Sequence, residues 1–125
     1  MIDHTATAMG GRLLRRWITA PLTEIERINQ RLDSVNYFTL NPRMHEQVGA
    51  SLKQMNDVER LVAKIATGRI NPKEVNALKT ALAQTTKLTT LLADAAAVAP
   101  LLARIENSTE VQEHITRWLS AEAPT

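Results

Sequence analysis

The sequence predicts an all-α fold, an irregular array of about six to seven helices of which one is long. Aromatic residues make up only 3% of the chain, so a core must be built from Leu, Ile, Val, Ala and Met, which suits packed helices better than a β-sandwich. Apolar residues recur at three- and four-residue spacings along most of the chain. Glycine is scarce, and the five prolines fall where one helix would give way to the next.

The first two helices are predicted over residues 8–18 and 23–37. In the first, one face gathers the apolar side chains Met9, Leu13, Leu14, Trp17 and Ile18, and the opposite face carries arginines. Pro21 ends this helix. Thr23 and Glu26 have the spacing of a capping box and should open the second helix. We expect its apolar residues to point inward and its charged residues mostly outward; these are Ile25, Ile28, Leu32 and Val35 against Glu24, Arg27, Arg31 and Asp33.

Two Asn-Pro pairs, Asn41-Pro42 and Asn71-Pro72, should each open a helix, because Asn caps well and Pro fits the first helical position. The helix after Pro42 carries the apolar stripe Met44, Val48, Leu52 and Met55. Asn56 can cap a further helix, and Gly68 is a natural left-handed stop for it. Its apolar residues are Val58, Leu61, Val62, Ile65 and Ala66.

The longest helix is predicted from Pro72 to about Ala93, and it would span roughly 30 Å. The alanine-rich residues 94–100 should contain a turn, followed by a short helix with Leu101, Leu102 and Ile105. Asn107 with Glu110 repeats the capping spacing and should open a last helix, in which Ile115 and Trp118 are core residues. We predict that residues 121–125 form a frayed tail.

Residue patterns for catalysis, cofactor binding or metal binding are missing from the sequence. His4, His45 and His114 fall on three different predicted elements, with no carboxylate at ligand spacing to complete a cluster. The pair Gly10-Gly11 is followed by Arg12 and lacks the lysine that a phosphate-binding P-loop requires. We therefore assign no catalytic, cofactor-binding or metal-binding residue to this chain.

Composition limits the partners and the compartment. The chain has no cysteine, which fits a reducing compartment, and neither a signal peptide nor a stretch long enough to span a bilayer can be identified. We expect a cytoplasmic protein with no membrane partner. Fifteen Lys and Arg against thirteen Asp and Glu leave a net charge of only +2, so binding to nucleic acid cannot be argued from charge alone.

The first helix carries three arginines, Arg12, Arg15 and Arg16. Three interpretations are open: they contact phosphate groups, they dock an acidic partner, or they form a solvated helix face. A DNA-reading helix would place polar side chains beside its arginines, and Trp17 and Ile18 do not supply them. Any contact with DNA would therefore be to phosphate. The two tryptophans, Trp17 and Trp118, are interpreted as core anchors or, in a piece of a longer protein, as exposed patches that the rest of that protein covers.

Four blocks of sequence, in order, resemble the MutS family of DNA mismatch-repair proteins. Residues 2–17 resemble the family segment L-D-x-T-x-T-x-M-G-x-R-x-L-x-x-W, with Ile2 in place of the leading leucine. Pro21-Leu22 and the blocks at residues 31–35, 57–61 and 66–72 follow, and beyond Leu82 only the leucine-rich helical character agrees. The matching positions, for which structural roles are expected, are Asp3, Thr5, Thr7, Met9, Gly10, Arg12, Trp17, Pro21, Arg31, Asp33, Asp57, Glu59, Arg60, Gly68, Arg69 and Pro72.

The resemblance implies that residues 1–125 form a single helical domain, the first part of the family's core and lever region. It also implies that the chain is a piece of a longer protein, without the mismatch-binding, connector, clamp and ATPase domains. In that longer protein we expect ATP with Mg²⁺, mismatched double-stranded DNA, a homodimer and the other domains of the polypeptide as cofactors and partners. The location would be the bacterial cytoplasm, at the nucleoid.

The function implied by the resemblance is mechanical: a non-catalytic lever that couples the ATPase to the clamp and to mismatch recognition. Two alternatives stay open. One is a free-standing helical adaptor whose apolar stripe receives a partner helix. The other is a weak binder of the DNA phosphate backbone through the cluster of Arg12, Arg15 and Arg16.

Overall fold

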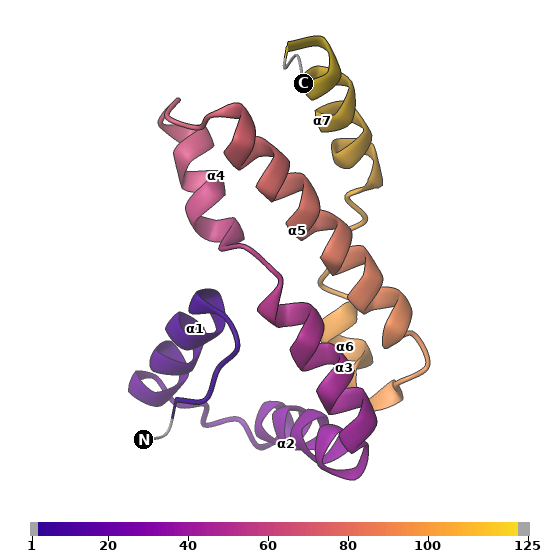
Figure 1. Ribbon diagram of the computed structural model, residues 1–125. Coiled ribbons are helices and arrows are strands. Elements are labelled where there is room, and N and C mark those ends of the chain that lie inside the picture. The colour runs from indigo at the N-terminus through magenta and orange to yellow at the C-terminus, as the bar shows by residue number, and fades with distance from the viewer. Residues whose placement is uncertain (1–2, 123–125) are drawn as a thin grey trace.

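The structure, a computed structural model, describes residues 3–122, and within this range it contains helices and no strand. The prediction of an all-α fold is confirmed. Figure 1 shows an open arrangement of the helices α1 (Ala8–Thr19), α2 (Ile25–Leu40), α3 (Pro42–Lys53), α4 (Val58–Ala66), α5 (Pro72–Leu91), the 3₁₀ turn η1 (Ala96–Val98), α6 (Ala99–Leu102) and α7 (Thr109–Glu122). Ile2, which begins the family-like segment, and positions 123–125 of the predicted tail lie outside the described residues.

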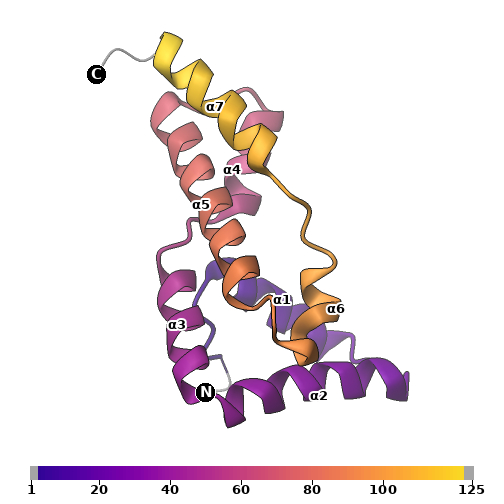
Figure 2. The same ribbon diagram turned by 90° about the vertical axis from the view of Figure 1, so that its right-hand side faces the viewer.

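Helix α5 is the spine of the fold. It has 20 residues and is therefore about 30 Å long, as predicted. Its first turn is closed by a reciprocal capping box, in which Asn71 Oδ1 accepts from the Glu74 backbone N–H at 2.9 Å and Glu74 Oε2 accepts from the Asn71 N–H at 3.1 Å. Along its length α5 packs against α3, α4 and α7 (Figures 1 and 2). It buries Leu78, Ala81 and Leu88.

A second packing centre lies just after α5. The predicted turn in the alanine-rich segment forms the 3₁₀ turn η1, and Leu92, Ala95 and Val98 are buried there. Side chains of α2, α3 and α6 pack around them; these are Tyr37, Phe38, Met44, Val48 and Leu102. Small alanine side chains let the chain reverse here while its backbone stays close to α2.

The prediction that the apolar face of α2 points inward is wrong. Ile25, Leu32 and Val35 are 75%, 57% and 62% exposed, and of the predicted stripe only Ile28 is half-buried. The opposite side of α2 makes the contacts, through Tyr37 and Phe38 and through Ser34, whose hydroxyl donates to the Ala97 carbonyl at 3.4 Å. An amphipathic stripe predicts burial, but no element among residues 3–122 covers this one.

Several predicted helix starts are corrected. Helix α2 begins at Ile25, and no side chain of the described chain caps it. The predicted capping box of Thr23 and Glu26 therefore does not form. The Asn41 side chain donates to the Tyr37 carbonyl at 2.7 Å instead of capping α3, although Pro42 does occupy the first turn. Asp57, rather than Asn56, caps α4.

At the last helix, the Asn107 side-chain carbonyl accepts from the Thr109 N–H at 2.9 Å, which makes a local turn before α7 instead of a capping box with Glu110. Neither tryptophan is a buried anchor, since Trp17 is 37% and Trp118 43% exposed. The stop at Gly68 is confirmed: its φ is +69°, and the Arg69 N–H returns to the Lys64 carbonyl at 2.9 Å.

Replacing Gly68 with alanine should destabilise the chain by about 1 kcal/mol, because an L-residue is strained at this positive φ even though open space surrounds its Cβ. The matched control is Gly49→Ala. It adds a Cβ in equally open space inside a helix and should stabilise by about 0.5–1 kcal/mol. Urea unfolding measures both, and equal effects of the two substitutions would contradict the assigned backbone at Gly68.

Candidate functional site

The segment before α1 folds back onto the first turn of that helix. Asp3 Oδ1 accepts from the Thr5 backbone N–H at 2.9 Å and from the Thr5 hydroxyl at 2.6 Å. Thr7 is the N-cap of α1, and its hydroxyl oxygen accepts from the Gly10 N–H at 2.9 Å. The hydrogen bonds from the Thr5 hydroxyl and then from the Thr5 backbone hold the pKa of the Asp3 carboxyl below its usual value. Asp3, Thr5 and Thr7 therefore build the start of α1.

The two glycines leave room for this turn. A Cβ at Gly10 would lie 3.1 Å from the Thr7 hydroxyl oxygen. At Gly11 it would lie 3.3 Å from the Thr5 hydroxyl oxygen and 3.4 Å from Asp3 Oδ2. Gly11 is the one buried residue of α1. The turn thus lies directly on the helix backbone, where a side chain would push it away.

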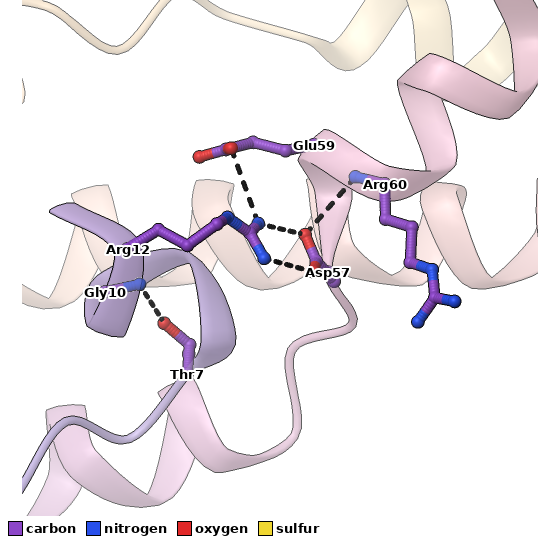
Figure 3. A network of polar contacts seen from close by, with 6 residues as sticks. All are labelled: Thr7, Gly10, Arg12, Asp57, Glu59 and Arg60. Carbon is purple, nitrogen blue, oxygen red and sulfur yellow. Dashed lines mark hydrogen bonds and ion pairs between the residues drawn. The ribbon is translucent and has the colours of Figure 1, made fainter. Parts of the chain in front are cut away.

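One turn further along α1, Arg12 reaches across to the start of α4 (Figure 3). Its Nη1 donates to Asp57 Oδ2 at 3.0 Å, and its Nη2 donates to Asp57 Oδ1 at 2.8 Å and to Glu59 Oε2 at 3.4 Å. The same Asp57 Oδ1 caps α4 by accepting from the Arg60 N–H at 3.2 Å. We call the contact of Arg12 with Asp57 and Glu59 the α1 latch.

The contact between Arg12 and Asp57 shifts the pKa of both groups. The hydrogen bond from Arg12 holds the pKa of the Asp57 carboxyl below its usual value of 3.8, against the opposing effect of partial burial. The same hydrogen bond raises the pKa of the Arg12 guanidinium. The Arg12 and Asp57 side chains are 42% and 21% exposed, so water and salt reach the pair.

Of the three arginines predicted to form a cluster on α1, only Arg12 takes part in the latch. Arg12 is engaged by two carboxylates, whereas Arg15 and Arg16 are exposed on α1. Arg31 of α2 places its guanidinium carbon 3.6 Å from the centre of the Trp17 ring, a cation–π contact. Two pairs of residues from different family-like blocks, Arg12 with Asp57 and Trp17 with Arg31, are thus brought together.

The last family-like block forms the tight connection between α4 and α5. Gly68 turns the chain, Pro72 occupies the first turn of α5, and Lys64 pairs with Glu74. Hydrogen bonds from Lys64 and from the Asn71 backbone hold the pKa of the Glu74 carboxyl below its usual value. Sequence reasoning missed Lys64 and Glu74, although the Asn71 and Glu74 spacing is the capping signature used elsewhere in the chain.

The other family-like positions take no part in a shared site. Met9 is half-buried on α1, while Pro21, Asp33 and Arg69 are exposed. Their structural roles stay a prediction. The chemistry of the chain is therefore concentrated in ion pairs and caps at helix ends.

The described residues include a hollow but no metal-binding cluster. No three His, Cys, Asp or Glu side chains among them gather closely enough to hold a metal ion. A hollow beside the C-terminal half of α5 is lined by Thr85, Thr86 and Thr89, whose hydroxyls donate to carbonyls of their own helix. These hydroxyls present no free donor to a ligand. Across residues 3–122, every helix is too short or too polar to cross a membrane.

Comparison with known proteins gives a consistent result. The family model described as MutS domain III matches residues 1–125. Proteins named DNA mismatch repair protein MutS are similar over part of the chain: 43% identical over 82 residues in Christiangramia forsetii, 46% over 82 residues in Phocaeicola vulgatus and 38% over 95 residues in Synechococcus. These matches cover 66%, 66% and 76% of this chain but only 9%, 9% and 11% of the relatives. No solved structure matches significantly.

The latch should give the chain a stability that depends on pH. Because the folded-state pKa of Asp57 is lowered, its contribution is complete above about pH 5 and is lost as the pH falls through the lowered pKa. Asp57→Asn removes the charge but keeps an amide oxygen that can cap α4. The stability difference between the parent and Asp57→Asn, measured by urea unfolding, should be constant near neutral pH and shrink in acid. A difference that is unchanged or grows in acid would contradict the assigned pairing.

Proposed function

This chain belongs to the MutS domain III family, and we propose that it is a non-catalytic lever, a set of packed helices that couples the ATPase of a mismatch-repair protein to its clamp and to mismatch recognition. The chain spans about a tenth of the length of the relatives it matches. The activity therefore belongs to the whole polypeptide, and this segment transmits a change of shape within it.

The observation that carries the proposal is the packing of α5. Three other helices contact this one 20-residue helix, so a displacement at either end moves a rigid body about 30 Å long. Leu78, Ala81 and Leu88 are buried along it. The capping box at Asn71 fixes the orientation of its first turn. A stiff helix with fixed ends is what mechanical coupling needs.

The distribution of polar contacts supports a mechanical role as well. The best-formed polar groups join one helix to another or close a helix end, as Arg12, Asp57 and Glu74 do. None of them converges on a cavity with a second reactive group. The side chains most similar to the family's motifs thus set the geometry of joints.

The larger assembly follows from the family. We propose that ATP and Mg²⁺ are bound by another part of the polypeptide, and that the whole protein acts on mismatched double-stranded DNA as a homodimer in the bacterial cytoplasm. The other domains of the same polypeptide are the direct partners of this segment. Arg15 and Arg16 remain available for phosphate contact, whereas Arg12 is held by carboxylates.

The isolated 125-residue chain should hydrolyse no ATP and should not distinguish a mismatched duplex from a matched one. Fluorescence anisotropy with the two duplexes measures the preference, and phosphate release measures hydrolysis. Mismatch-selective binding by this chain would contradict the proposal. Equal binding to both duplexes that falls steeply with salt and is weakened by Arg15→Glu would instead favour backbone contact through α1.

Softening α5 should uncouple the lever in a full-length mismatch-repair protein that carries this segment. Thr80 and Lys87 are exposed within this helix. Replacing both with glycine weakens the helix by about 1 kcal/mol at each position relative to replacing both with alanine. We expect the glycine variant to keep basal ATP hydrolysis but lose most of its response to a mismatch, while the alanine control keeps both. An undiminished response in the glycine variant would refute the role of α5.

A further inference from the structure

Helix α1 is attached to the rest of the molecule differently from the long helix α5. It buries no large apolar side chain: Gly11 is its one buried residue, and Asp3 and Thr5 of its own leading turn lie over it. Of its large apolar residues, Leu13, Trp17 and Ile18 are 39%, 37% and 56% exposed, and Met9 and Leu14 are half-buried. Helix α5, by contrast, buries three residues against its neighbours.

Two guanidinium groups make the described polar and cation–π contacts between α1 and other helices. Arg12 binds Asp57 and Glu59 at the start of α4, and Arg31 of α2 stacks on Trp17. Both contacts are open to solvent in part, since the Arg12 and Glu59 side chains are 42% and 55% exposed and Trp17 is 37% exposed. Ionic contacts of this kind are screened by salt, whereas a buried apolar interface is not.

The leading turn belongs to α1 and would move with it. The side-chain hydrogen bonds of Asp3, Thr5 and Thr7 all end within residues 3–10. After Thr19 the chain continues through residues 20–24, which are exposed apart from the half-buried Leu22. Within the described part of the chain no backbone hydrogen bond is made by Pro21, Leu22 or Thr23. This short segment can act as a pivot.

We propose that residues 3–19 form a detachable arm, which undocks as a unit about residues 20–24 when the α1 latch opens, while α2 to α7 stay folded. Asp57 makes the release local. Its carboxylate caps α4 as well as binding Arg12, so α4 keeps its cap when Arg12 leaves. The inference rests on the contacts of α1 and does not depend on the lever function.

A distance measurement between α1 and α4 tests the arm. The chain contains no cysteine, so spin labels can be attached at Arg16→Cys on α1 and Ala66→Cys on α4, both exposed and outside the latch. We expect one short distance in the parent at low salt. Arg12→Gln and Asp57→Asn should each raise the population of a second, longer distance by about fivefold, with unchanged helical circular dichroism.

Salt and a matched ion pair provide the controls. Raising NaCl from about 0.1 M to about 1 M shortens the Debye length from about 10 Å to about 3 Å and should shift the parent toward the longer distance. Lys64→Gln removes the ion pair between α4 and α5 and should leave the distance as in the parent. An unchanged distance in both latch variants and at high salt would overturn the proposal. So would loss of the whole helical signal in both variants, since the arm would then be inseparable from the fold.

Discussion

The packing of one long helix is the constraint on which the rest of the structure depends. Helix α5 contacts three other helices, and the chain turns directly after it into the small core around Val98. Its position along the chain matters because the helices before and after it can both reach it. The capping box at Asn71 and the left-handed turn at Gly68 fix where this helix begins and how it leaves α4.

Local chemistry explains why so many helix boundaries could be predicted. The all-α class, the start of α3 and α5 at an Asn-Pro pair, and the stop at Gly68 all follow from residues within a few positions of each other. One failure arose where two local caps compete. Asn56 and Asp57 are both able caps, and the structure uses Asp57, whose second oxygen can also meet Arg12.

The sequence identified the residues of the candidate site but did not predict that they meet. Arg12, Asp57 and Glu59 were each identified, but nothing in a single sequence indicates that residues 45 and 47 positions apart would meet. The same limit explains the error on α2. Periodicity shows that Ile25, Leu32 and Val35 share one face of a helix, but it does not say which element covers that face, and none of the described ones does.

The accessible surface links these observations to mechanics. The chain exposes 9449 Å², against roughly 6,700 Å² expected for a compact monomer of its mass. An array this open has no single central core: its helices are held by the packing of α5, by the small core around Val98, and by the caps and ion pairs at helix ends. Those contacts are discrete and individually separable. A structure held in this way can change shape at one joint, such as the Arg12–Asp57 contact, while its spine keeps its form.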